Sequence, residues 1–141
     1  MKNKIFCALF LLITVFAVSC KKEPGIGGDA SIQGKILVRH YNSIFGVPPG
    51  LINEYNGADI YVYIIYGNNI SYGQRIKSSY DGRFEFKYLY EGDYKIYIYS
   101  IDSAAVVHNP SVIHPDSAAI VKVSITDRKQ EEDIGTLTIF Q

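Results

Sequence analysis

The chain has 141 residues, and its 14 basic residues balance its 14 acidic residues, so the formal net charge is zero. Removing a leader that contains Lys2 and Lys4 would leave twelve basic against fourteen acidic residues, a net charge of −2. A nucleic-acid-binding protein needs clustered Lys and Arg, and this chain lacks such clusters. We therefore expect no nucleic-acid partner.

The first residues predict export. Lys2 and Lys4 precede an uncharged apolar run over residues 5–18, which is shorter than the roughly 20 residues of a membrane-spanning helix and is typical of a secretory signal peptide. The run ends at Ala17-Val18-Ser19-Cys20, which resembles a bacterial lipobox. The resemblance implies cleavage before Cys20 and attachment of lipid, with acyl chains such as palmitate, to its sulfur. The alternatives are an ordinary signal peptide cut near Ala17 or Ser19 and an uncleaved anchor.

The lipobox would make the chain an outer membrane lipoprotein of the cell envelope, and the side of the membrane it faces stays open. Residues 1–19 are then the signal peptide. Cys7 leaves with this leader and Cys20 carries lipid, so the folded part has no thiol for disulfides, catalysis or metal ligation. Residues 20–31 contain mostly Lys, Glu, Pro, Gly, Asp and Ala with a single large apolar residue, Ile26, and predict a flexible tether. Residues 32–141 form the predicted domain.

This domain has apolar residues at a period of two, interrupted by Gly, Asn, Asp and Pro, which predicts an all-β fold without an amphipathic helix. Tyr80-Asp81-Gly82 is expected to form the tight turn between the strands 74–79 and 83–88, because Asp tolerates and Gly readily adopts positive φ. Residues 42–58 and 102–117 are expected to be long loops, which are common sites of function. The expected strands are 32–41, 59–66, 74–79, 83–88, 93–101, 118–126 and 134–140.

Three stretches of the sequence have a family resemblance when taken in order. They are Gly57-Ala58-Asp59-Ile60-Tyr61-Val62, Ser79-Tyr80-Asp81-Gly82-Arg83-Phe84-Glu85-Phe86 and Glu91-Gly92-Asp93-Tyr94-Lys95-Ile96-Tyr97-Ile98. Together they are similar to the carboxypeptidase regulatory-like and transthyretin-like (prealbumin-like) superfamily. The resemblance implies a seven-stranded, Ig-like antiparallel sandwich and a non-catalytic binding or accessory module. One enzymatic branch of this group hydrolyses 5-hydroxyisourate and ends in Tyr-Arg-Gly-Ser, a motif that this chain lacks.

The sequence shows no pattern that fixes a catalytic or metal site. The spacing of His108 and His114 across Pro110 does not impose the geometry of three or four metal ligands, and His40 lies elsewhere in the chain. We therefore expect no enzyme activity, no metal and no cofactor.

The repeated Asp-Ser-Ala at residues 102–104 and 116–118 resembles an O-glycosylation acceptor of exported proteins in one group of Gram-negative bacteria. The resemblance implies glycans on Ser103 and Ser117. The alternative is that Asp and Ser begin turns before strands.

Strand parity sorts the tyrosines, because successive side chains point to opposite faces of a sheet. Phe84, Phe86 and Tyr88 are predicted to face the core. In the next strand Tyr94 points inward with the isoleucines at positions 96 and 98. The outward set is Tyr61, Tyr63, Tyr97 and Tyr99.

The family resemblance places the strands 59–66 and 93–101 side by side, which would bring the four outward tyrosines together. Exposed aromatic patches often mark interaction sites, so this face could bind a protein or a sugar ring. Alternatively, the tyrosines serve only as strand residues that stabilise the sheet through cross-strand pairs. We predict a lipid-anchored, non-catalytic module that binds a protein or glycan partner. A structural or adhesive subunit of a surface assembly is the alternative.

Overall fold

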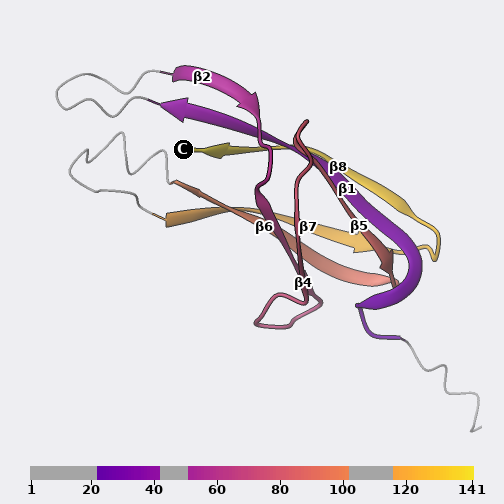
Figure 1. Ribbon diagram of the computed structural model, residues 1–141. Helices are drawn as coiled ribbons and strands as arrows, with labels where there is room; N and C mark the ends of the chain where they lie inside the picture. Colours follow the sequence, from indigo (N-terminus) through magenta and orange to yellow (C-terminus); the bar gives the residue numbers. More distant parts are fainter. Residues whose placement is uncertain (1–21, 42–50, 102–115) are drawn as a thin grey trace, which may run out of the picture.

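The computed structural model describes residues 22–41, 51–101 and 116–141 (Figure 1). The all-β prediction is confirmed, and the described residues contain no helix that is long and apolar enough to span a membrane. The strands of the described residues are β1 (Ile26–Tyr41), β2 (Leu51–Asn56), β3 (Tyr61–Tyr66), β4 (Gln74–Lys77), β5 (Arg83–Leu89), β6 (Gly92–Ile101), β7 (Asp116–Ile125) and β8 (Glu131–Phe140).

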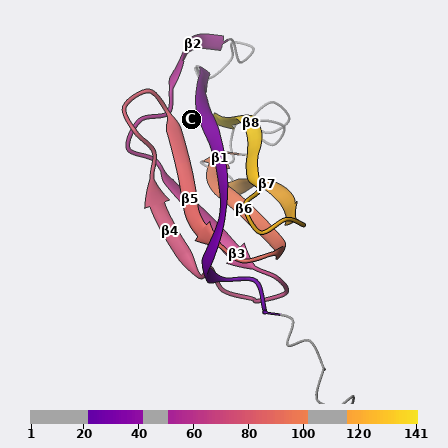
Figure 2. The same ribbon diagram turned by 90° about the vertical axis from the view of Figure 1, so that its right-hand side faces the viewer.

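The strands form two sheets that pack face to face as two layers (Figures 1 and 2). One sheet has the order β4-β3-β6-β7, and all its neighbours are antiparallel. In the other sheet β1 is central, with β2 and β5 paired to successive halves of one edge and β8 paired to the opposite edge. The predicted β-sandwich is confirmed.

Two details of the sandwich differ from the prediction. The described residues form eight strands rather than seven, because β2 lies inside the predicted loop 42–58. The pair β1–β8 is parallel, whereas the prediction was antiparallel throughout. The parallel pair arises because the chain changes sheets between β7 and β8, and so joins β1 without a hairpin between them.

The sheet also begins earlier than predicted. Residues 26–31, assigned to the tether from composition, belong to β1 and pair with the end of β5, and Ala30 is fully buried. Gly28 explains why this segment can lie so close to β5, since an added Cβ would collide with the Leu89 carbonyl group. A glycine-rich composition here reflects close packing of two backbones rather than flexibility.

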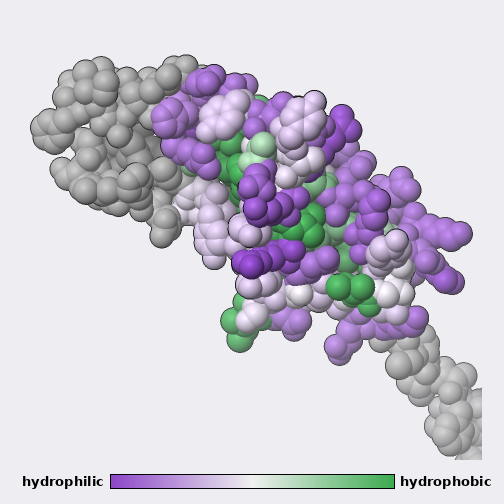
Figure 3. Space-filling view, viewed as in Figure 1, coloured by the Kyte–Doolittle hydropathy of each residue, from purple (hydrophilic) through white to green (hydrophobic). Residues whose placement is uncertain are grey.

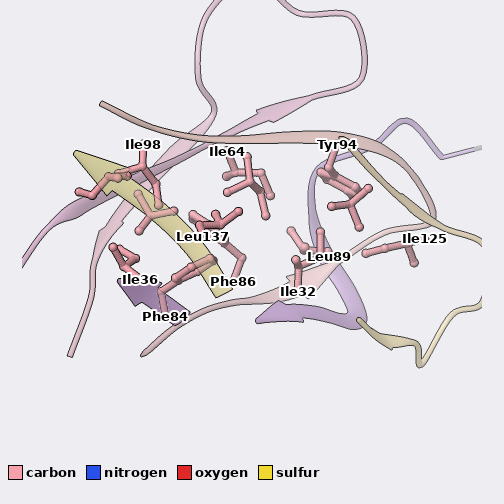
Figure 4. Packing of buried hydrophobic residues seen from close by; sticks show 14 of the residues in the cluster. Ile32, Ile36, Ile64, Phe84, Phe86, Leu89, Tyr94, Ile98, Ile125 and Leu137 are labelled. Carbon is pink, nitrogen blue, oxygen red and sulfur yellow. The ribbon is translucent and has the colours of Figure 1, made fainter. Parts of the chain in front are cut away.

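The core fills the space between the sheets (Figure 4). Tyr94 and Phe86 are its largest fully buried side chains, and both were predicted to face inward. Tyr88 was predicted to join them, but its side chain is 66% exposed. Between the pairs Ile32–Phe86 and Ala30–Leu89, β5 has one residue more than β1. This bulge places Tyr88 at a positive φ of 61° and turns Leu89 inward in its place.

The predicted turn at Asp81-Gly82 is confirmed, and Gly82 has a φ of 83°. Its carbonyl accepts a hydrogen bond from the Ile36 amide at 2.8 Å, and the Ile36 carbonyl accepts one from the Gly57 amide at 2.9 Å. Two glycines of the family-like motifs therefore lie against the middle of β1, at the point where β2 ends and β5 begins.

Candidate binding face

The sheet β4-β3-β6-β7 turns its alternate side chains away from the core. Val62 and Ile64 of β3 are buried, so Tyr61 and Tyr63 lie on the outer face. The same alternation in β6 buries the isoleucines at 96 and 98 and places Tyr97 and Tyr99 outside. The predicted pairing of these two strands is confirmed, with Tyr63 directly opposite Tyr97.

The four rings form one connected cluster in which Tyr63 contacts the other three. The Tyr63 and Tyr97 rings stack, with their centroids 4.9 Å apart and an angle of 10° between their planes. Tyr99 meets this stack edge-on, with centroids 5.5 Å from Tyr63 and 5.7 Å from Tyr97. The Tyr61 ring lies 6.4 Å from Tyr63. Each such aromatic pair contributes about 0.5–1.5 kcal/mol beyond the burial of area, so the cluster stabilises this sheet whatever else it does.

A fifth tyrosine joins the cluster from outside any strand. The Tyr72 ring packs edge-on against Tyr63, with centroids 5.2 Å apart. Sequence reasoning missed Tyr72 because strand parity cannot place a loop residue. The chain folds back over β3 here, since the Gly73 amide donates to the Ile64 carbonyl at 2.9 Å. We call the set Tyr61, Tyr63, Tyr72, Tyr97 and Tyr99 the tyrosine face.

The tyrosine face offers both ring surface and hydroxyl groups. Tyr99 is 61% exposed, Tyr72 47% and Tyr61 41%, while Tyr63 and Tyr97 are half-buried between them. Burial raises the pKa of Tyr97 above the ordinary value of 10.0, and the neighbouring phenol of Tyr99 raises it further. This phenol is therefore neutral at physiological pH and acts as a hydrogen-bonding group rather than as a charge.

Basic side chains flank the tyrosine face on the β4 side. The Arg75 guanidinium lies over the Tyr61 ring, 4.7 Å from its centroid, and the Lys77 ammonium lies 5.1 Å from the same centroid. Lys77 also donates to the Asp59 carboxylate at 2.7 Å, and this hydrogen bond raises the pKa of Lys77. These two cation–π contacts cover part of Tyr61 and leave Tyr99 as the most exposed ring.

On the β7 side the neighbours are first apolar and then basic. Ala118 lies opposite Tyr99 in the β6–β7 register, and Ile120, which is 62% exposed, lies opposite Tyr97. One outward position further along, Lys95 of β6 lies opposite Lys122 of β7. The side of the molecule drawn in Figure 3 is largely hydrophilic, and small hydrophobic patches interrupt it.

The structure leaves most other predicted site residues untested. Cys20, Ser103 and the histidines at 108 and 114 lie outside the described residues. Ser117 lies in β7 opposite Ser100 and is half-buried, and its glycosylation stays a prediction. His40 is exposed on β1. Within the described parts of the chain, no three His, Cys, Asp or Glu residues gather as metal ligands would.

A hollow of about 750 Å³ lies at the end of the sandwich where the chain enters β1. Glycine backbone and charges of both signs, including Lys22, Asp93 and Arg128, line it, and the Lys22 ammonium lies 4.5 Å from the Tyr90 ring centroid. The lining of this hollow mixes Lys22 and Arg128 with Glu91 and Asp93 and offers the single ring of Tyr90, so it does not define a ligand. The tyrosine face is therefore the stronger candidate site.

Comparison with known proteins adds little about function. No family model and no curated protein matches the chain. Among solved structures, it is similar to a Pseudomonas aeruginosa protein for which carbohydrate binding has been proposed, with a TM-score of 0.47, 11% identity, and coverage of 90% of this chain and 96% of that one. It is also similar to part of a 9R-lipoxygenase from Cyanothece, with a TM-score of 0.33 and 15% identity, and covers 23% of that chain. At these values the likeness carries no argument about function.

Proposed function

We propose that this chain is a lipid-anchored, non-catalytic module of the cell envelope that binds carbohydrate through the tyrosine face. The observation that supports this proposal is the convergence of five tyrosine rings on one outer sheet face. The C–H groups of a sugar ring pack against an exposed aromatic ring, while phenol hydroxyls hydrogen-bond to sugar hydroxyls. Tyr99, as the most exposed ring of this face, is the principal stacking surface.

The surroundings of the tyrosine face favour a glycan over a protein partner. Lysine is depleted at protein–protein interfaces, whereas tyrosine and arginine are enriched there. Here Arg75 and Lys77 lie directly on Tyr61, and Ile120 is the exposed aliphatic residue opposite Tyr97. A surface of phenols and cations suits a hydroxyl-rich ligand better than an apolar one.

The chemistry of this face also supports a non-catalytic role. Its groups are phenols and basic side chains, and the raised pKa of Tyr97 removes that phenol further from a general base at neutral pH. The nearby Asp59 carboxylate is hydrogen-bonded to Lys77 and exposed to solvent. Membership of the carboxypeptidase regulatory-like superfamily, which would fit such a module, stays a prediction.

The anchor is the second part of the proposal. The apolar run of residues 5–18, which ends within Ala17-Val18-Ser19-Cys20, supports lipidation of Cys20 and export to the outer membrane. Each buried acyl methylene contributes about 0.8 kcal/mol, so two or three chains would hold the protein in the bilayer permanently. The binding face would then act at the cell envelope.

The test is binding of the full-length protein, purified in detergent, to a panel of neutral and acidic polysaccharides in affinity electrophoresis and calorimetry. We expect at least one polysaccharide to bind, and Tyr99→Ala to weaken its affinity about tenfold or more, which corresponds to about 1.4 kcal/mol. Tyr80→Ala is the matched control, because Tyr80 is 89% exposed but lies on the turn between β4 and β5, away from the face.

Binding to no polysaccharide, or equal affinity of wild type and Tyr99→Ala, would overturn the carbohydrate proposal. A purified protein partner whose affinity depends on Tyr99 would replace the glycan with a protein ligand. Concentration-dependent oligomers of the detergent-purified protein would instead favour a subunit of a surface assembly.

A further inference from the structure

Two lysines of the sheet β4-β3-β6-β7 stand in an arrangement that the fold alone does not explain. Lys95 and Lys122 are directly opposite each other in the antiparallel pair β6–β7. Like charges in this position destabilise a sheet. Among the described residues, five ion pairs form, and neither lysine takes part in one.

The outer face of the other sheet shows a different arrangement. There Arg39 pairs with Glu54, Arg83 with the carboxylate of residue 81, and Lys87 with Glu85, at 2.7, 3.3 and 2.9 Å. Most basic side chains on that face are therefore compensated by neighbouring carboxylates. The sheet that carries the tyrosine face keeps an excess of positive charge.

The carboxylates on the outside of the tyrosine-bearing sheet do not remove this excess. Asp59 is engaged by Lys77 at 2.7 Å. Asp93 lies one outward position beyond Lys95 but takes part in none of the five ion pairs of the described residues, and its carboxylate accepts a hydrogen bond from the Ser124 hydroxyl at 2.6 Å. The arrangement leaves Lys95 and Lys122 available to an anion that comes from outside the chain.

The position of these cations relative to the rings indicates which kind of anion would bind. Lys95 and Lys122 lie one outward position beyond Tyr97 and Ile120, and Arg75 lies across β3 from them, opposite Tyr63 in the register. A ligand that lies along the face would therefore contact rings in the middle and cations on both sides. A polymer of sugar rings with acid groups provides both contacts at once.

We infer that the ligand of the tyrosine face is an anionic polysaccharide whose acid groups pair with Lys95 and Lys122. This inference rests on the proposed carbohydrate function. An acidic peptide would supply the charge without the sugar rings, and a neutral polysaccharide would supply rings and leave the lysine pair uncompensated. The contact is exposed, so salt should weaken it progressively as the Debye length shortens from about 10 Å at 0.1 M toward about 3 Å at 1 M.

The test uses the full-length protein in detergent and measures its affinity for polygalacturonate and alginate. Fully methyl-esterified polygalacturonate keeps the ring backbone and removes the charge, and poly-L-glutamate keeps the charge and removes the rings. We expect an acid polysaccharide to bind at least tenfold more tightly than either control. We also expect its affinity to fall when ionic strength rises from about 0.05 to about 0.5 M.

Variants identify the contact. Lys95→Gln combined with Lys122→Gln should weaken acid-polysaccharide binding at least tenfold without lowering the melting temperature, because the substitutions remove a like-charge pair. Lys35→Gln is the matched control, since Lys35 is a half-buried lysine on β1 that also lacks a described ion pair but lies on the other sheet. Its affinity should equal that of wild type.

The outcomes separate this inference from the carbohydrate proposal. The esterified polymer could bind as tightly as the acid polymer, or only a neutral polysaccharide could bind, in either case through Tyr99. Either result keeps the proposed function and overturns the anionic ligand. Equal binding of poly-L-glutamate, an unaffected double lysine variant, or no binding of either acid polymer also overturns it. Self-association that depends on the two lysines would assign the face to a second copy of the chain instead.

Discussion

The hydroxyl of Tyr94 joins the start of β1 to the turn between β5 and β6. It donates to the Tyr90 carbonyl at 2.6 Å and accepts from the Gly25 amide at 3.1 Å, while its ring is 1% exposed in the core. Tyr66 packs edge-on against this ring, with centroids 5.9 Å apart. The Tyr66 hydroxyl is also buried, but it has no hydrogen-bond partner among the described residues.

These two phenols predict opposite results for the same chemical change. Tyr94→Phe removes two hydrogen bonds, each of which contributes about 0.5–1.5 kcal/mol net, and leaves the Gly25 amide and the Tyr90 carbonyl without this partner. We expect the free energy of unfolding to fall by about 1–3 kcal/mol, from a total of roughly 5–15 kcal/mol for a domain. Tyr66→Phe removes an unsatisfied polar group and should leave stability unchanged or raise it by up to about 1 kcal/mol.

Urea denaturation followed by circular dichroism measures both changes, provided that the m-values stay equal to that of wild type. Hydrogen exchange of the Gly25 amide gives an independent reading, and it should accelerate in Tyr94→Phe alone. If the two variants lose stability equally, then the hydrogen bonds of the Tyr94 hydroxyl do not set the two positions apart, and the reasoning is refuted.

Three further predictions concern pH, backbone strain and the anchor. Because burial raises the pKa values of Tyr66, Tyr94 and Tyr97 above 10.0, unfolded phenols ionise first, so stability is fully present below pH 10 and decreases as pH rises above it. Tyr97→Phe should reduce this alkaline loss, as measured by denaturation below and above pH 10, and an unchanged loss would contradict the assignment. The φ of 61° at Tyr88 is unfavourable for most side chains and worst for a β-branched one. Tyr88→Gly should therefore be neutral or stabilising by up to about 1 kcal/mol, and Tyr88→Val should cost about 1–2 kcal/mol. Equal melting temperatures of the two variants would argue against backbone strain. Cys20→Ser should move the protein out of the membrane fraction, and its retention there would refute the lipoprotein prediction.

Strand parity located most of the fold and of the tyrosine face. Alternation works where a strand is regular, and it correctly turned Tyr94 inward and placed Tyr61 and Tyr99 outside. It failed at Tyr88, because a bulge inserts a residue and reverses the faces that follow. The bulge is visible only in the pairing of β5 with β1, so a single run of sequence does not reveal it.

Composition misled at two places for a related reason. The glycines near residue 28 resemble a flexible linker, yet they allow β1 to lie against the Leu89 carbonyl. β2, with Asn53 and Glu54 exposed, lacks the apolar alternation that identifies a strand. β2 is a strand because its backbone pairs with the second half of β1, and not because its side chains alternate.

The charge pattern on the tyrosine-bearing sheet depends on register. Lys95 and Lys122 are far apart in sequence, and nothing in either strand indicates that they lie opposite each other. Tyr72 likewise reaches the cluster only because its loop folds back over β3. Contacts between distant segments are what the structure adds to the four tyrosines found from sequence.

The early start of β1 also limits how far the domain could move from a membrane. The hydrogen bonds of Tyr94 hold Gly25 against the sandwich, so only five residue steps separate Cys20 from the folded part. A fully extended chain reaches about 3.6 Å per residue, so Cys20 and Gly25 are at most about 18 Å apart. With Cys20 lipidated, the domain would stay next to the bilayer. Gly92 packs against Pro24, and Tyr99 lies seven positions along β6 from Gly92, which is about 23 Å at 3.3 Å per residue. A polysaccharide would therefore have to approach the membrane to be bound.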